Sequence, residues 1–290
     1  MQSNRPRERN KRQGAGAKTA VPPTPADPAA RAVVTARAAD NEPLVSARGI
    51  TRYFGGVVAV NDVTLDFYAG EIVALVGDNG AGKSTFVKLL SGILHPDRGE
   101  FLIGGEPVSG LTPLRARAFG IENVYQDLAL CDNLGAAANV MLGQEPVHLG
   151  RLRFLDERRA QREARALIGN VGVQLEDLET PVRRLSGGQR QAVALARALV
   201  HAHRMVILDE PTAALGVRQT QATLEVVRRV ASQSVAVIMI SHNLDDVFAV
   251  ATRIVVLRLG SVVLDARRDQ TNREEVVTSM TGTSRVAASR

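Results

Sequence analysis

The residues with the clearest chemical meaning form a glycine-rich loop between an apolar run and a helical pattern. The loop reads Gly77-Asp78-Asn79-Gly80-Ala81-Gly82-Lys83-Ser84-Thr85 and fits the pattern G-x-x-x-x-G-K-[ST]. Its glycines let the backbone approach a polyphosphate closely with N–H groups turned inward, and the helix N-terminus adds partial positive charge. We expect Lys83 to contact the β- and γ-phosphates and the Ser84 hydroxyl to bind Mg²⁺.

Two adjacent acids end another apolar run. Asp209 and Glu210 follow residues 205–208, and a buried strand should not end in unpaired charge without reason. In phosphate-loop enzymes an acid at this strand end orients Mg²⁺ or its water, a role that suits Asp209. Glu210, one residue further on, can polarise the attacking water as a general base.

Two more polar residues follow predicted strands. Gln126 comes directly after residues 121–125, and His242 follows residues 235–240 after Ser241. Parallel α/β sheets bind ligands beyond the carboxyl ends of their strands. We therefore expect Gln126 and His242 to join the acid pair in one site.

The elements that must position these residues can be read from the apolar runs. Residues 72–76, 205–208 and 235–240 are apolar without polar alternation, which is typical of strands covered on both faces in a parallel α/β sheet, and residues 121–125 are a further predicted strand. Residues 83–90 have helical spacing. Residues 127–185 show mainly helical patterns, charged and alanine-rich over 151–170, and no clear buried strand. We interpret this region as a helical subdomain inserted into the α/β core.

A second glycine-rich stretch opens a strong helical pattern over residues 192–200. It reads Leu185-Ser186-Gly187-Gly188-Gln189-Arg190-Gln191, and Ser186 and Gln189 have the spacing of a capping box. Two adjacent glycines in the first turn of a helix reduce its stability by about 1 kcal/mol each. They make sense if the helix N-terminus must lie close to an anion.

With these motifs, residues 44–283 resemble the nucleotide-binding subunit of an ABC transporter, and residues 185–189 match that family's signature motif. The resemblance implies a P-loop NTPase fold of the ABC type, with a parallel-sheet core, an antiparallel β part and an inserted helical subdomain. It implies an ATPase that uses ATP and Mg²⁺. It also implies a head-to-tail homodimer in which Ser186, Gly187, Gly188 and Gln189 of one copy contact the γ-phosphate held by the phosphate loop of the other.

The same resemblance assigns roles to single residues. It implies that Tyr53 stacks on adenine, that Gln126 touches Mg²⁺ and the membrane partner, and that His242 contacts the γ-phosphate. Glu210, His242 and Gln126 are then the predicted catalytic residues. The predicted metal ligands are Ser84, Gln126 and Asp209.

Within the family the chain is most similar to ATPases of bacterial monosaccharide importers of the ribose, xylose and fructose type. Four stretches carry this resemblance: residues 50–57, 124–134, 209–217 and 241–248. Many members of that branch have two fused nucleotide-binding halves, whereas this chain has one phosphate loop and one signature, so we expect it to pair with a second copy. The expected partners are transmembrane permease subunits and, indirectly, a sugar-binding protein, at the cytoplasmic face of the membrane.

One residue departs from the pattern of many ABC proteins. Gly216 stands where they have an aspartate after Ala-Leu, as it does in the sugar branch. We do not interpret it as inactivating. It removes any cross-dimer contact that a carboxylate at this position would make.

Composition limits the remaining possibilities. The chain has 290 residues, 45% hydrophobic and 23% charged, and a single cysteine, Cys131, which cannot form an internal disulfide. Residues 235–240 form a run of six apolar residues, far short of the roughly 18 that a spanning helix needs. The net charge is +6, and residues 1–43 hold eight Arg and Lys against four Asp and Glu. We expect these residues to be a disordered basic leader and 284–290 to be a short tail.

Two other classes of function remain as alternatives. One is a soluble ABC ATPase that acts on nucleic acid or ribosomes, and the other is a subunit that does not hydrolyse ATP. The basic leader favours the first slightly, but there is no long coiled coil, zinc-ligand set or second ATPase half, so no specific nucleic acid is expected. Glu210, His242 and Ser186 argue against the second. Within transport, the alternative is import of another small solute.

Overall fold

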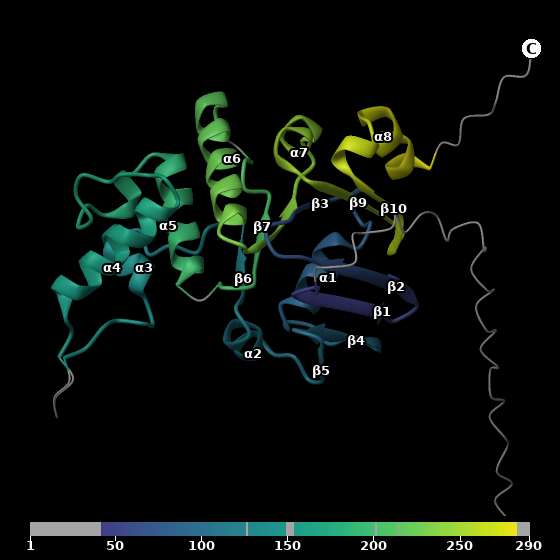
Figure 1. Cartoon of the computed structure of the whole chain (residues 1–290), viewed down its shortest axis with the longest axis horizontal. Coiled ribbons are helices and arrows are strands. Elements are labelled where there is room, and N and C mark those ends of the chain that lie inside the picture. The colour runs from purple at the N-terminus through teal and green to yellow at the C-terminus, as the bar shows by residue number, and fades with distance from the viewer. Residues whose placement is uncertain (1–41, 126, 149–153, 201, 214, 283–290) are drawn as a thin grey trace, which may run out of the picture. The chain divides into compact units, whose positions relative to one another are not determined.

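The computed structural model describes residues 42–125, 127–148, 154–200, 202–213 and 215–282 (Figure 1). The expected leader of residues 1–43 lies outside the described residues apart from its last two, and the expected tail of residues 284–290 lies outside them entirely. The predicted site residue Gln126 also lies outside them.

A six-stranded sheet forms the centre of the described fold. Its strand order is β10-β9-β3-β8-β7-β6, and every neighbouring pair is parallel except β9 with β10. The bounds are Ile72–Val76 for β3, Ile121–Val124 for β6, Met205–Asp209 for β7, Ala236–Ile240 for β8, Arg253–Arg258 for β9 and Ser261–Arg267 for β10. The four predicted strands therefore match β3, β6, β7 and β8 within one residue at each end.

The lack of polar alternation in these runs has a simple cause, which is burial of both faces. Val73 and Leu75 of β3 pack in one hydrophobic cluster, and Ala74 and Val76 pack in a second cluster on the opposite face. Because successive side chains of a strand point to opposite faces, a strand covered on both sides needs apolar residues at every position.

One face of the central sheet is covered by α1 (Lys83–Leu90) and a second, antiparallel sheet. That sheet has the order β2-β1-β4-β5, with bounds Val45–Phe54 for β1, Val57–Phe67 for β2, Arg98–Ile103 for β4 and Glu106–Val108 for β5. Phe86 of α1 is fully buried and packs beside Phe67 of β2, with ring centroids 6.5 Å apart. This cluster joins the two sheets and holds the helix that follows the phosphate loop.

The other face is covered by helices. Figure 1 shows α6 (Val217–Ser232), α7 (Leu244–Val250) and α8 (Arg273–Thr281) along this side of the sheet. The short η3 (Arg268–Gln270) precedes α8. The buried side of α5 (Gly187–Leu199) belongs to the same cluster as that of α6, together with residues of β7 and β8.

The described residues between β6 and β7 contain helices and only isolated bridges. They are α3 (Ala136–Met141), α4 (Glu157–Asn170), η2 (Val182–Arg184) and α5, whereas α2 (Pro113–Ala118) precedes β6. The helical spacing predicted from residue 151 starts later than expected. Leu155 forms a bridge with Val147, and the Asp156 side chain caps α4 by accepting from the Arg159 N–H.

Candidate functional site

The phosphate loop joins β3 to α1, and its glycines are required by close neighbours. At Gly77 (φ 148°) a Cβ would lie 2.2 Å from the Leu257 carbonyl oxygen, and at Gly82 (φ 102°) 2.4 Å from that of Ala59. The turn after β9 also donates to the loop, from the Gly260 N–H to the Ala81 carbonyl at 3.0 Å. The loop is thus held in place by strands far from it in sequence, at positions where only glycine fits.

Lys83 bends back over the loop that precedes it. Its Nζ donates to the carbonyl oxygens of Gly77 at 2.7 Å and Asp78 at 3.0 Å. Burial lowers the pKa of Lys83, and the negative charges of Glu210, Asp78 and Asp209 oppose that shift. The ammonium therefore lies within electrostatic reach of the acid pair.

The first turn of α1 is open to an anion. Its N-cap is Gly82, which provides no side-chain cap, and the turn contains no acidic residue. Ser84 is exposed on this turn and Thr85 is half-buried. The first N–H groups of a helix lack partners within the helix, so this end can donate hydrogen bonds to phosphate oxygens.

The acid pair lies at the carboxyl edge of the central sheet. Asp209 ends β7 opposite Ile240 of β8, and the Glu210 N–H donates to the Ile240 carbonyl at 3.0 Å. Burial raises the pKa of Asp209, and the neighbouring charge of Glu210 adds to the shift. Glu210 has φ 51°, a left-handed backbone that is uncommon outside glycine and is often found at functional sites.

His242 meets Glu210 directly. Its Nδ1 lies 2.8 Å from Glu210 Oε2, and the histidine side chain is 78% exposed whereas that of Glu210 is 18% exposed. The buried Thr212 hydroxyl donates to Asp246 Oδ2 at 2.6 Å, which ties the chain after the acid pair to α7. The structure therefore brings Asp209, Glu210 and His242 to one edge, as their positions after apolar runs predicted.

Tyr53 lies on the strand pair that borders the loop. It is half-buried on β1 opposite Val58 of β2. Ala59, which follows Val58, has the carbonyl oxygen that lies close to Gly82 of the phosphate loop. Its backbone N–H donates to Asp97 Oδ2 at 2.7 Å. These contacts place Tyr53 on the strands beside the loop.

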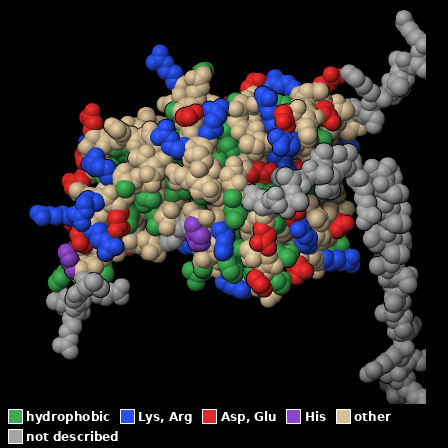
Figure 2. Space-filling view, viewed as in Figure 1, with side chains coloured by type: hydrophobic (Ala, Val, Ile, Leu, Met, Phe, Trp, Pro, Cys, Tyr) green, Lys and Arg blue, Asp and Glu red, His purple; other side chains and the backbone are tan. Residues whose placement is uncertain are grey.

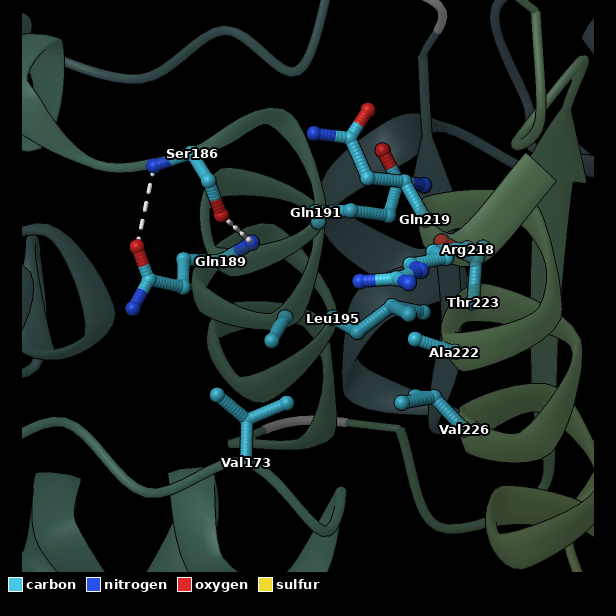
Figure 3. A pocket seen from close by; sticks show the side chains of 12 residues that line it. Val173, Ser186, Gln189, Gln191, Leu195, Arg218, Gln219, Ala222, Thr223 and Val226 are labelled. Carbon is cyan, nitrogen blue, oxygen red and sulfur yellow. Dashed lines mark hydrogen bonds between the residues drawn. The ribbon is translucent and has the colours of Figure 1, made fainter. Parts of the chain in front are cut away.

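The glycine-rich stretch 185–189 forms the start of α5 with the predicted cap. The Gln189 N–H donates to Ser186 Oγ at 3.3 Å, and the Ser186 N–H donates to Gln189 Oε1 at 2.9 Å. Both residues are among those that line a pocket between α5 and α6, together with Gln219 and Thr223 of α6 (Figure 3). Gly187 also lies close to the next loop, since a Cβ there would be 3.0 Å from Leu215 Cδ2.

Sequence reasoning missed several residues that shape this site. Ala59 and Leu257 act through backbone carbonyls, so their side chains give no signal for the role. The Thr212–Asp246 pair could have been found, since both residues lie in the stretches 209–217 and 241–248 that contain the predicted site residues.

Comparison with solved structures defines the class of protein. A nucleotide-free ATP-binding cassette from an ABC transporter superimposes with a TM-score of 0.69 at 20% identity, covering 83% of this chain and 96% of that one. The cbiO1 protein of Clostridium perfringens, part of an ABC transporter complex, superimposes with a TM-score of 0.69 at 26% identity, covering 81% and 92%. The fold is that of an ABC-type P-loop NTPase, as predicted.

Sequence comparison gives the family. The sequence model of the ABC transporter family matches residues 60–213, so the chain belongs to the ABC transporter family. A fructose import ATP-binding protein of Rhizobium meliloti is 42% identical over 246 residues, covering 83% of this chain and 95% of that protein. A xylose/arabinose import ATP-binding protein of Sulfolobus acidocaldarius is 40% identical over 238 residues, covering 82% and 94%. The predicted resemblance to the monosaccharide branch is confirmed.

A longer relative is matched over only about half of its length. A ribose import ATP-binding protein of Rubrobacter xylanophilus is 42% identical over 241 residues, which cover 83% of this chain but only 48% of that protein.

In the part of the chain that the structure describes, no helix is long and apolar enough to cross a membrane.

Proposed function

We propose that this chain is the ATP-hydrolysing subunit of a membrane importer, that its solute is a monosaccharide, and that ATP binding closes a head-to-tail dimer which hydrolysis reopens. The observation that carries the proposal is that the Lys83 ammonium lies within electrostatic reach of Asp209 and Glu210, and that His242 contacts Glu210 at the same edge of the sheet. The fructose and xylose/arabinose import proteins described above support the choice of a sugar as solute.

Mg²⁺ fits the oxygen groups at this edge. The described residues contain no group of three or more His, Cys, Asp or Glu side chains that could hold a metal by themselves. Mg²⁺ usually binds through one or two carboxylates together with substrate phosphates and waters, so a closed protein cage is not needed. Asp209, whose charge is disfavoured by burial, and the exposed Ser84 hydroxyl would hold it, with Gln126 as the further predicted ligand. The ion would neutralise charge on the phosphates of ATP.

Glu210 is placed to act as the general base. Water that attacks the γ-phosphate must lose a proton, and the Glu210 carboxylate accepts it while the bond from the γ-phosphorus to the bridging oxygen breaks. His242, in contact with Glu210 Oε2, holds that carboxylate and reaches toward the γ-phosphate with its exposed ring. Tyr53 stacks on adenine from the strands that border the phosphate loop.

The separation of the two halves of the site supports the head-to-tail dimer. Ala81 of the phosphate loop packs in the cluster on one face of the central sheet, and Ala192, after the signature residues, packs in the cluster on the opposite face. A second copy, turned head to tail, would bring its Ser186 to this loop. The fold neighbours include a dimeric cassette bound to ADP and phosphate, 24% identical with a TM-score of 0.64.

A groove beside β6 suits the membrane partner. Its lining includes Leu114 of α2, Tyr125, Leu142 and Arg197, and the first three are 78%, 42% and 43% exposed. Exposed apolar side chains around a groove are typical of a protein contact. We place the transmembrane permease subunits here, at the cytoplasmic face, with the sugar-binding protein acting through them. In this proposal residues 44–283 are one ATPase domain, and residues 127–185 are its helical subdomain.

On the surface, charges do not favour a nucleic-acid partner. On the face that Figure 2 shows, Lys and Arg side chains of the described residues are interspersed with Asp and Glu. Strong nucleic-acid binding needs a continuous basic patch or stripe.

Glu210→Gln tests the proposal. Because the amide cannot accept the proton, we expect phosphate release to be slower by about a hundredfold to ten-thousandfold, while ATP binding is retained and ATP-dependent dimers accumulate. Phosphate release and light scattering measure the two effects. The control is Glu225→Gln on the outer side of α6, where the glutamate contacts Arg228. Wild-type turnover in Glu210→Gln would exclude Glu210 as the base.

A further inference from the structure

Residues 127–135, which we call the connector, are held by the side chains of Arg197 and Asn139, which form hydrogen bonds with backbone groups of the connector. Arg197, near the end of α5, donates from Nη1 to the Ala129 carbonyl at 2.6 Å and from Nη2 to the Leu128 carbonyl at 2.8 Å. Both carbonyl residues have left-handed backbones, with φ 56° at Leu128 and φ 45° at Ala129. Such a turn of non-glycine residues is strained and needs outside support.

A second side chain holds the far end of the connector. Asn139 of α3 is fully buried, and its Oδ1 accepts from the Cys131 N–H at 2.7 Å. Its Nδ2 donates to the carbonyls of Cys131, Leu134 and Gly135 at 3.1–3.2 Å. The connector is therefore fixed to α3 at one end and to α5 at the other.

The Arg197 contact differs from an ordinary surface contact. Burial lowers the pKa of Arg197, so its charge is held in a partly desolvated place by the two carbonyls. The planar guanidinium donates to both from two nitrogens, a geometry that a lysine ammonium cannot reproduce. The same arginine lies eight residues beyond Gln189, on the helix that begins with Ser186.

We propose that Arg197 is a positioning residue that ties the signature helix α5 to the connector, so that the chain following Gln126 and the helix that carries Ser186 move together. The proposal rests on the proposed function, in which these two segments serve ATP hydrolysis. Arg197 holds a strained turn through two charged hydrogen bonds, and no contact with nucleotide is required.

The test compares three variants of the full chain. Arg197→Gln removes both hydrogen bonds, Arg197→Lys keeps the charge, and Arg165→Gln is the matched control, since Arg165 of α4 donates to the Leu175 carbonyl at 3.3 Å. Hydrogen exchange reports the order of amides 127–134 and of α5, and steady-state phosphate release gives kcat and KM for ATP.

We expect Arg197→Gln to speed hydrogen exchange in residues 127–134 by about tenfold, because at least one charged hydrogen bond to this segment is lost. Exchange in α5 should stay the same. We expect kcat to fall roughly threefold to tenfold with KM for ATP unchanged, since the phosphate loop is held by other strands. Arg197→Lys should recover part of both effects, and Arg165→Gln should behave as wild type.

Unchanged exchange in Arg197→Gln would overturn the proposal. So would equal losses of kcat in Arg197→Gln and Arg165→Gln, which would indicate a general structural effect. The exchange measurement does not need ATP hydrolysis. A chain with no ATPase activity would therefore contradict the proposed function while the tie between Arg197 and the connector was still tested.

Discussion

Two clusters of charged side chains in this molecule differ in whether their charges pair with each other. At the carboxyl edge of the central sheet, Asp209 and Glu210 lie side by side, and Lys83 donates to loop carbonyls instead of a carboxylate. At the border of β9 and β10, Arg253 is 7% exposed and pairs with both carboxylate oxygens of Asp265. It also donates to the Asp66 carbonyl at 2.8 Å and lies 3.6 Å from Glu71 Oε2.

The pKa shifts show what the difference means. Burial disfavours the charge of Arg253, but the hydrogen bonds and charge of Asp265, with Glu71 and Asp66, more than offset it and raise its pKa. At the sheet edge burial dominates, lowering the pKa of Lys83 and raising that of Asp209. A structural cluster satisfies its own charges, whereas the site leaves charge for a ligand to satisfy.

Removing the arginine of the structural cluster should have the largest effect on stability. We expect Arg253→Met to lower the free energy of unfolding by about 3–5 kcal/mol, because the half-buried Asp265 would lose the guanidinium that pairs with both of its carboxylate oxygens. Urea unfolding measures this. The control is Arg267→Met on β10, whose partner Asp269 is exposed, and there the loss should be under about 1 kcal/mol. Equal losses in both variants would contradict the distinction.

Removing Lys83 should weaken ATP binding without lowering the stability of the fold. We expect Lys83→Ala to weaken ATP binding by roughly tenfold to a hundredfold, since it removes a charged hydrogen-bond donor to the phosphates. Titration with a fluorescent ATP analogue measures the change. Lys88→Ala, in the last turn of the same helix, is the control and should bind as wild type. A loss of stability as large as that of Arg253→Met would show that Lys83 is structural.

Sequence patterns located the site better than they explained it. The runs at β3, β7 and β8 could be predicted because burial on both faces leaves a continuous apolar signal. The antiparallel strands β1 and β2 gave no such signal, since polar residues interrupt them, and only the family resemblance predicted an antiparallel part. Contacts made through backbone, such as those of Ala59 and Leu257 with the phosphate loop, cannot be read from residue types.

The two charge clusters illustrate the same limit. Adjacent acids after an apolar run identified Asp209 and Glu210, because such a placement is costly without a function. The partners of Arg253 lie in two segments, residues 66–71 and Asp265, so nothing local in the sequence predicts their meeting. The left-handed backbone of Glu210 likewise depends on its hydrogen bond to Ile240 in the neighbouring strand.

The smallest predicted effect is the pH-dependent contribution of Asp209 to the free energy of unfolding. The ordinary pKa of an aspartate is 3.8, and burial first, then the charge of Glu210, raises that of Asp209 in the folded chain. The stability that this group contributes is therefore fully present below its unfolded pKa and is lost as pH rises through its folded pKa. At pH 7 in EDTA, we expect Asp209→Asn to be more stable than wild type by up to about 1 kcal/mol, since partial exposure screens the charge. The gap should close toward acid pH.

Asp177→Asn is the control with the opposite sign. Hydrogen bonds from the Glu179 N–H and then the Thr180 hydroxyl lower the pKa of Asp177, so its contribution is present above its unfolded pKa and is lost as pH falls through its folded pKa. Wild type should thus be more stable than Asp177→Asn at neutral pH, and this difference should also shrink in acid. Urea unfolding from pH 2 to pH 8 tests both variants, because the Asp177 contribution changes only below the ordinary aspartate pKa of 3.8. If Asp209→Asn loses stability at pH 7 as Asp177→Asn does, the Asp209 charge stabilises the fold, and the contrast between site and structural cluster fails.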